Sequence, residues 1–378
     1  MQRSDKRATR VITELVRKLN DLVAEGRPLG TLVSELGPRI YDGRSESLLA
    51  EDDDIVVLHI SDMHLGPSYP FRLPHGVLSR QETGKKSLAQ MLAADLEDLK
   101  LVGRIDSLVI SGDFTETARL DQFNRAREVL QEILDKIGLD LSRVVVTAGN
   151  HDLDWTPGAL NQTEPMSGVS RETYETFREL LRFEGGALVD VHSFPSLTGK
   201  TLLRVLSLDS NFVEGPKAAG IGYISEDAFY EADRLLKLQD TSKFETFRTW
   251  IVLHHHVFPA TSLTIEEVQR PKLTVLANSS DLLAFAGQIG AEVILHGHEH
   301  QPSVTVARRW PADTGLDFQP IIGVGAGSIS APRSDLGPFS RHQYFILFRK
   351  SDHIVIRSRA MGDTGLAFGP HRDLIIPF

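Results

Sequence analysis

The sequence predicts an α/β fold, and two observations carry that prediction. Short, largely β-branched apolar runs of strand length alternate with longer amphipathic runs of helix length. Polar residues follow the strands directly, as functional groups do at strand carboxyl ends in α/β proteins. The predicted strands cover residues 55–58, 107–111, 144–148, 202–208, 250–253 and 293–295, and the predicted helices cover residues 88–101, 120–137, 171–182, 225–238 and 282–289.

The remaining parts of the chain are predicted to be loops and a β-rich closing layer. Residues 67–86 are polar and contain three prolines, and the segment is long enough to serve as an active-site loop. Residues 153–171 are also expected to be loop-like, because proline and glycine recur in them. Short apolar runs at residues 321–324, 344–348 and 354–356 are expected to form the strands of the closing layer.

Residues 1–50 are predicted to be an N-terminal helical appendage to a catalytic domain that spans residues 51–378. Apolar side chains fall at helical spacing between residues 12 and 23, and a second short helix is expected over residues 31–36. The apolar face is expected to pack on the catalytic domain, and the alternatives are a contact between copies in a homo-oligomer or a contact with another partner. The acidic run at residues 51–54 is expected to be a solvated linker.

Composition narrows the classes of function. Of the 378 residues, 41% are hydrophobic and 24% are charged, which is typical of globular proteins. The chain has no cysteine, which excludes disulfides, thiolate metal sites and cysteine nucleophiles, so any metal must be bound by Asp, Asn, Glu or His. The net charge of −10 argues against binding long nucleic acid. The sequence contains no apolar run long enough to span a membrane and no signal-peptide pattern, so we expect a cytoplasmic protein.

Five short motifs follow predicted strands and contain residue types that bind divalent metals. Each motif alone has an ordinary structural explanation, such as a turn, a helix cap or a surface histidine. Their conjunction at strand ends indicates a metal site, because carboxylates, amides and imidazoles are the ligands of hard and borderline cations. Residues two apart on a strand share a face, so Asp62 and His64 are expected to converge. The motifs are Asp62-x-His64, Gly112-Asp113, Gly149-Asn150-His151-Asp152, His254-His255-His256 and Gly297-His298-Glu299-His300.

These five motifs closely resemble the signature of the calcineurin-like metallophosphoesterase superfamily. The resemblance extends from Asp62 to His300 and leaves out residues 1–50. It implies a four-layer α/β/β/α sandwich of two mixed β-sheets flanked by helices. It also implies a dinuclear centre with two divalent metal ions, most often manganese or iron, with zinc and nickel as alternatives.

Position by position, the resemblance implies a role for each motif residue. Asp113 would bridge the two ions, and one residue of the histidine run would bind the second. Relatives with a His-His-Pro run indicate the middle residue, His255; because Pro259 stands further along here, His254 remains the alternative. The other ligands would be Asp62, His64 and His300 for one ion, and Asn150 and His298 for the second.

Two further residues are candidates for roles in catalysis. The resemblance places His151 beside the leaving-group oxygen as general acid or transition-state stabiliser. It also assigns Glu116, three residues after the bridging Asp113, to the orientation of His151. The alternative for Glu116 is an acidic residue at the start of a helix, after Thr115.

The implied activity is hydrolysis of a phosphoester. Two divalent cations against two ligand carboxylates leave a net positive site, which attracts a phosphate while a bridging hydroxide attacks in line. The Leu-His-His-His run is most similar to the bacterial cyclic-nucleotide and general phosphodiesterase branch, so we expect a small phosphodiester or nucleotide substrate and no membrane partner. A DNA-repair-type nuclease and a phosphomonoesterase are the alternatives within the superfamily. A scaffold that kept the fold and lost catalysis is the alternative from another class.

Overall fold

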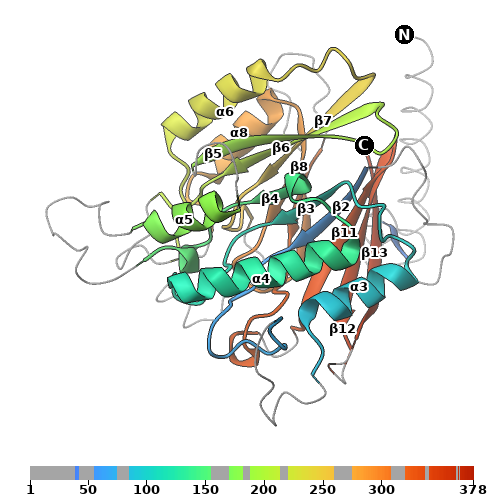
Figure 1. The fold of residues 1–378 in the computed structure, drawn as a ribbon. Coiled ribbons are helices and arrows are strands. Elements are labelled where there is room, and N and C mark those ends of the chain that lie inside the picture. The colour runs from blue at the N-terminus through green and yellow to red at the C-terminus, as the bar shows by residue number, and fades with distance from the viewer. Residues whose placement is uncertain are drawn as a thin grey trace, which may run out of the picture.

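Two mixed β-sheets lie face to face, and helices cover the outer face of each (Figure 1). This arrangement is seen in a computed structural model of the chain. It confirms the predicted α/β class and the two mixed sheets with flanking helices. The residues that the structure describes are 39–41, 55–74, 85–154, 170–181, 188–212, 220–258, 275–307, 320–336, 340–362, 365 and 367–378.

The first sheet has seven strands and carries three of the candidate motifs. Its strands β2, β3 and β4 run parallel, whereas β11, β12, β13 and β1 are joined to β2 and to one another in antiparallel fashion. In spatial order the strands are β1 (Arg39–Tyr41), β13 (Phe368–Pro377), β12 (His353–Met361), β11 (Gln343–Arg349), β2 (Ile55–Ile60), β3 (Ser107–Ile110) and β4 (Val144–Val146).

The second sheet has six strands and carries the two remaining motifs. Its four central strands are parallel, and each edge strand is antiparallel to its neighbour. In spatial order the strands are β5 (Val189–Pro195), β6 (Thr201–Leu208), β7 (Thr246–Val252), β8 (Ala291–His296), β10 (Ile321–Gly325) and β9 (Ser303–Ala307).

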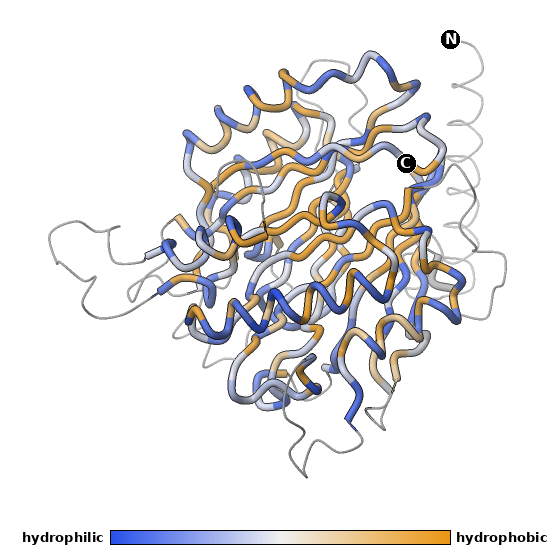
Figure 2. Tube along the Cα trace, viewed as in Figure 1, coloured by the Kyte–Doolittle hydropathy of each residue, from blue (hydrophilic) through white to orange (hydrophobic). Residues whose placement is uncertain are grey.

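Helices α3 (Leu88–Asp98), α4 (Leu120–Ile137) and α5 (Glu172–Leu180) belong to the layer beside the seven-stranded sheet, and α6 (Glu226–Leu238) and α8 (Ser279–Gln288) cover the six-stranded sheet (Figure 1). Apolar side chains of both sheets fill the space between them, and the strands are largely apolar in Figure 2, with polar residues interspersed. Along α4, apolar and polar residues recur in the same view at helical spacing, because one face of the helix packs on the sheet.

Two parts of the sequence prediction differ from the structure. The expected closing layer is split, because β10 joins the six-stranded sheet while β11 and β12 join the seven-stranded one. Strands β5 and β13 were not predicted, since charged residues interrupt their apolar patterns; one of them, Asp373 in β13, is buried in an ion pair with Arg357. The apolar runs used to predict strands are local features of the sequence, whereas strand pairing depends on residues far away along the chain.

Much of the N-terminal prediction falls outside the described residues. The helices expected over residues 12–23 and 31–36 and the acidic run at 51–54 lie there, so they stay predictions. Within the predicted appendage, Arg39–Tyr41 forms strand β1 and pairs with β13 of the large sheet. Among the described helices, none combines the length and apolarity needed to cross a membrane.

Candidate metal centre

The candidate ligands lie just beyond the carboxyl ends of five strands, where the two sheets meet. β2 ends at Ile60 and β8 at His296, so the Asp62-x-His64 and His298-x-His300 pairs are not on strands. The expected reason for convergence, strand alternation, is therefore wrong. Instead, both members of each pair adopt a left-handed backbone conformation, with φ of 55° at Asp62 and 47° at His64.

Left-handed conformations are concentrated at this centre. Seven non-glycine residues with positive φ occur in the described part of the chain, and five of them are candidate ligands. Such residues cost free energy and persist only where their surroundings fix them. Here the fixing contacts are backbone hydrogen bonds, from Asp62 N to Gly112 O (3.1 Å) and from His64 N to Asp113 O (3.0 Å). The five ligands are Asp62, His64, Asp113, His298 and His300.

Motif glycines allow the strand ends to approach this closely. A Cβ atom on Gly149 would lie 2.0 Å from Asp113 Oδ1, and one on Gly297 would lie 1.8 Å from Ser61 Oγ. Neither position has room for a side chain, so glycine is needed for close approach rather than for a turn.

The first ligand group brings together Asp62, His64, Asp113 and His300. One ligand atom from each lies within 4.8 Å of the others. His64 Nε2 lies 3.6 Å from Asp113 Oδ2, and His300 Nε2 lies 3.5 Å from Asp62 Oδ1. The Nε2 atoms of His64 and His300 are 2.9 Å apart. Two imidazole nitrogens that face one another beside two carboxylates fit a divalent cation between them.

The second group shares Asp113 with the first and adds His254 and His298. His254 Nε2 lies 3.3 Å from Asp113 Oδ2 and 3.2 Å from His298 Nδ1. Asn150 Oδ1 closes the group, at 3.1 Å from His254 Nε2 and 2.9 Å from His298 Nδ1. Its amide oxygen is therefore placed to serve as a fourth donor.

The histidine of the run that faces the ligand cluster is not the one predicted. His254, the alternative, faces the cluster, and His255 turns its Nδ1 to Ser210 Oγ at 2.8 Å. His255 also packs against Gly222, where a Cβ atom would lie 2.5 Å from its ring. His256 contacts His296 instead, with ring centroids 4.3 Å apart. The geometry thus favours His254 over His255 as the ligand.

Backbone carbonyls orient two of the ligand histidines. His254 Nδ1 donates to Ser111 O at 2.7 Å, and His300 Nδ1 donates to Asp335 O at 3.0 Å. A carbonyl can only accept, so in each ring Nδ1 carries the hydrogen and Nε2 faces the cluster. The sequence could not reveal these partners, because any residue type supplies a carbonyl.

The charges of the cluster are coupled. Burial raises the pKa of Asp62, but the hydrogen bond and charge of His300 outweigh it and lower the pKa to about 2. Burial lowers the pKa of His254, but the charge and hydrogen bond of Asp113, together with the charge of Asp62, outweigh it and raise the pKa to about 10. The same competition, with Asp62 as partner, raises the pKa of His300 to about 9. Metal binding must displace these imidazole protons, so metal affinity should rise with pH.

His151 lies beside the first group and is exposed to solvent. Its ring is 4.9 Å from that of His64, and its backbone N donates to Asp113 Oδ1 at 2.9 Å. Its Nδ1 lies 2.9 Å from the backbone O of Glu116, which can only accept. Nε2 is therefore left to face a ligand.

Glu116 contacts His151 through its backbone, whereas the prediction assigned this role to its carboxylate. The side chain packs over Gly66 instead, where a Cβ atom would lie 1.9 Å from Glu116 Oε2. Oε2 is buried and has no hydrogen-bond partner among the described residues.

Asp152 is a site residue to which sequence reasoning gave no role. Its Oδ1 accepts from Thr115 N at 3.0 Å and from Thr115 Oγ1 at 3.1 Å, and its Oδ2 accepts from Gly149 N at 2.9 Å. It thereby ties the loop after β3, which carries Asp113, to the loop after β4, which carries Asn150. The available signal was its fixed place at the end of the Gly-Asn-His-Asp motif.

Comparison with known proteins agrees with this geometry. The sequence profile of the calcineurin-like phosphoesterase family matches residues 55–302, about two thirds of the chain, and contains every candidate ligand. The chain belongs to the calcineurin-like phosphoesterase family. No curated protein matches its sequence. Membership in this phosphoesterase family supports a phosphoester hydrolase, and the His/Asp groups agree with a dinuclear divalent metal site.

Solved structures with this family's fold resemble the chain at low sequence identity. A purple acid phosphatase from yellow lupin seeds shares 13% identity with a TM-score of 0.53, covering 87% of this chain and 55% of the lupin chain. This chain thus spans about half the length of the lupin protein. A predicted phosphoesterase from Streptococcus pneumoniae (13% identity, TM-score 0.34, 86% and 98% coverage) and Vacuolar Protein Sorting 29 from Cryptosporidium parvum (12%, 0.33, 86% and 99%) are more distant.

Proposed function

We propose that this protein is a metal-dependent phosphodiesterase that hydrolyses a small phosphodiester, with cyclic nucleotides among the candidate substrates. One observation carries the proposal: two buried ligand groups share Asp113, and the exposed ring of His151 stands beside them. The shared carboxylate would hold two cations close together, and the exposed imidazole is available to a substrate held there.

The donor set fits two divalent ions, for which manganese and iron are the candidates. Asp113 would contact both ions. When bound, the ions supply Lewis acidity for a phosphate and lower the pKa of water. Asp62, His64 and His300 would complete the first site, and Asn150, His254 and His298 the second.

His151 would protonate the leaving alcohol. In the proposed hydrolysis a water oxygen bonds to phosphorus, the bond from phosphorus to the leaving oxygen breaks, and that oxygen takes up a proton. A linear diester gives a phosphomonoester and an alcohol, whereas a cyclic nucleotide gives one product that carries both groups. Because Nδ1 of His151 donates to Glu116 O, the proton for the leaving oxygen comes from Nε2 of the imidazolium form. The bond from His151 N to Asp113 Oδ1 fixes the ring relative to the ligand groups.

Charge supports a diester over a monoester. A phosphomonoester dianion carries one more negative charge than a diester and usually meets additional basic side chains. Among the described residues, no Lys or Arg forms an ion pair with Asp62 or Asp113, whose partners are histidines.

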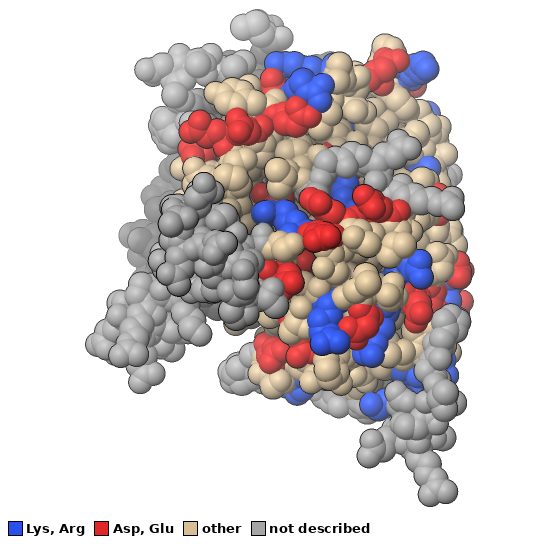
Figure 3. All heavy atoms as spheres, turned by 60° about the vertical axis from the view of Figure 1, so that its left-hand side comes forward, with Lys and Arg blue, Asp and Glu red and all other residues tan. Residues whose placement is uncertain are grey.

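Charge also argues against a nuclease. On the face in Figure 3, the described Lys and Arg side chains are interspersed with Asp and Glu rather than gathered in a basic stripe.

The test is hydrolysis by the manganese-loaded full chain of four substrates: bis-p-nitrophenyl phosphate, p-nitrophenyl phosphate, cyclic AMP and linear DNA. Metal content is measured in the same preparations. We expect two metal ions per chain and a kcat/KM for the diester well above that for the monoester. A preference for p-nitrophenyl phosphate or for DNA would replace the proposal with one of the two alternatives. Two bound metals without turnover of any substrate would indicate a scaffold.

A further inference from the structure

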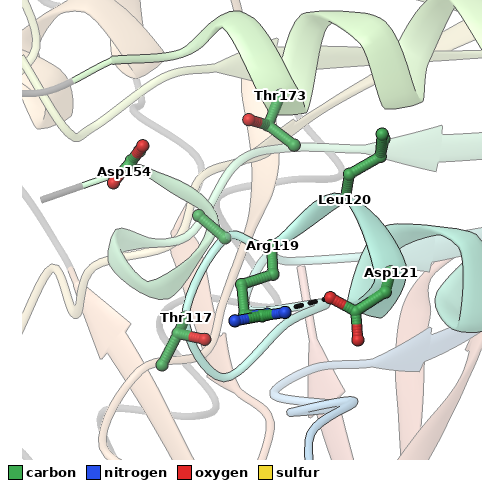
Figure 4. A pocket seen from close by; sticks show the side chains of 7 residues that line it. Thr117, Arg119, Leu120, Asp121, Asp154 and Thr173 are labelled. Atoms are coloured by element: carbon green, nitrogen blue, oxygen red, sulfur yellow. Dashed lines mark hydrogen bonds and ion pairs between the residues drawn. The ribbon is translucent and has the colours of Figure 1, made fainter. Parts of the chain in front are cut away.

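An open pocket of about 480 Å³ has no role in the reaction described above. Two chain segments that leave the metal centre form most of its wall. Residues 117–121 follow the loop that carries Asp113 and Glu116, and Asp154 follows the turn that carries His151. Thr173, in the first turn of α5, closes the opposite side (Figure 4). Its volume is in the range of small-ligand sites.

Hydrogen bonds fix this pocket relative to His151. Thr115 Oγ1 donates to the backbone O of His151 at 2.9 Å and accepts from Ala118 N at 3.0 Å. Ala118, in the pocket wall, has a left-handed backbone conformation with φ of 52°. Thr117 N donates to Gln122 Oε1 at 2.9 Å, which joins the wall to α4. The pocket is therefore preformed, two hydrogen bonds away from the residue that would protonate the leaving oxygen.

The lining indicates which ligand would fit. Arg119 and Asp121 project from one side and Asp154 and Thr173 from the other (Figure 4). Within the lining two carboxylates face one guanidinium, and Arg125, which lies 3.8 Å from Asp121 and outside the lining, offsets the second carboxylate, so the side-chain charges balance close to zero. A second phosphate would find no surplus of positive charge here. An uncharged ligand would find donors and acceptors.

Two further features of the wall favour a hydroxyl-bearing ligand. The side chains of Arg119 and Asp121 are 70% and 50% exposed, and their ion pair of 2.9 Å is weak enough for Arg119 to turn to a ligand. Leu120 is 51% exposed, which offers an apolar surface between these polar groups. Alternating C–H and O–H groups, as in a polyol or a sugar ring, match such a wall.

We infer that this pocket binds the leaving alcohol of the diester, and that this alcohol is an uncharged polyol or sugar. The inference rests on the proposed diesterase activity. It assigns Thr173 and Arg119 to hydrogen bonds with the hydroxyl groups of that alcohol. Because the scissile oxygen belongs to the same alcohol, these contacts would hold it beside His151.

The test compares three diesters in the manganese-loaded full chain. Glycerophosphoglycerol releases glycerol, a dinucleoside monophosphate releases a nucleoside, and bis-p-nitrophenyl phosphate releases an alcohol without hydroxyl neighbours. The variants are Thr173→Val and Arg119→Gln. Matched controls are Thr176→Val, three residues further along α5 and outside the pocket, and Arg125→Gln, which removes the other arginine paired with Asp121.

For each pocket variant we expect kcat/KM on a hydroxylated diester to fall about tenfold more than on bis-p-nitrophenyl phosphate, mainly through KM. The control variants should change this ratio by less than about twofold, since their side chains lie outside the pocket. A loss confined to the glycerol or to the nucleoside diester would identify the source of the alcohol.

Equal losses on all three diesters, or none, would overturn the inference. So would a wild-type chain that cleaves only bis-p-nitrophenyl phosphate, and in that case the diesterase activity itself would stand. If the wild type with two bound metals cleaves none of the three, the proposed function fails instead.

Discussion

Two sets of histidines at the strand ends differ in what their ring nitrogens contact. The metal-facing histidines converge on two carboxylates and one amide oxygen, whereas the interior histidines contact each other or the core. Among the described residues, four ring nitrogens of the interior histidines have no hydrogen-bond partner, and three of them belong to one contacting pair, His256 and His296. The metal-facing histidines are His64, His254, His298 and His300, and the interior histidines are His59, His256 and His296.

Protonation does not separate the two sets, because burial lowers the pKa of the metal-facing His64 to about 4 and that of His298 well below its usual value. Nearby carboxylates raise the pKa of His254 and His300, although burial opposes the rise. Burial lowers the pKa of the interior His59 to about 3 and that of His296 well below its usual value, and no carboxylate outweighs it. Residue type and position at a strand end are common to both sets. Proximity to the carboxylates, rather than protonation, therefore distinguishes the histidines that could bind a cation.

Removing the shared carboxylate should have the largest effect. We expect Asp113→Asn to lose both metal ions and all measurable hydrolysis, because each ligand group loses its bridging donor. Metal content by mass spectrometry and turnover of bis-p-nitrophenyl phosphate check this, with circular dichroism to confirm folding. Two metals at full occupancy in the variant would show that Asp113 does not bridge.

The histidine run allows a matched comparison between the two sets. We expect His254→Gln to reduce metal content from two ions to one and to abolish most activity. His256→Gln should keep both ions, because that ring faces His296. His255→Gln tests the register predicted from sequence, and we expect it to keep both ions as well. Loss of one ion in the His255 variant alone would restore the original prediction.

The outcome for this run shows how far the sequence could lead. The α/β class, most strands and the order of the five motifs follow from local patterns of apolar and polar residues, and those patterns predicted them. Which of three adjacent histidines faces the carboxylates depends on contacts with Ser111 and Ser210, more than 40 residues away along the chain. No local pattern records such contacts.

The backbone conformation of the ligand pairs was equally inaccessible. Asp62 and His64 converge through left-handed φ angles that distant backbone groups, Gly112 O and Asp113 O, hold in place. Strand alternation predicted the convergence of the same pair, but for the wrong reason. Sequence therefore predicted which residues meet at this centre better than it predicted how they meet.

His151 belongs to neither set, since it lies beside the ligands without joining them. We expect His151→Ala to lower kcat by roughly 10²–10⁴-fold with metal content unchanged, as for loss of a proton donor. The loss should be larger for a diester with an alkyl leaving group than for bis-p-nitrophenyl phosphate, whose leaving group needs little protonation. Near-normal turnover of the alkyl diester would exclude this role.

The interior histidines should affect the stability of the fold at acid pH. The pKa of His59 is lowered in the fold, so its neutral form contributes stability above pH 6.5, and that contribution is lost as pH falls from 6.5 towards 3. Urea unfolding of the metal-free chain at pH 7 and pH 5 should show wild type losing about 2 kcal/mol more than His59→Gln. Equal losses of unfolding free energy in wild type and variant would show that His59 does not contribute to the loss of stability at acid pH. The control is His353→Asn, a partly exposed histidine in β12.

The smallest effect is expected at Glu116, because its backbone carbonyl, and not its carboxylate, contacts His151. Glu116→Gln should change kcat by less than the roughly tenfold typical of losing an orienting side chain, because His151 Nδ1 donates to the carbonyl of residue 116, which the variant keeps. The pH profile of kcat should also keep its shape, since the proton donor has the same neighbour. A tenfold loss in Glu116→Gln and in Glu116→Ala alike would show that the carboxylate, packed over Gly66, acts on His151 after all.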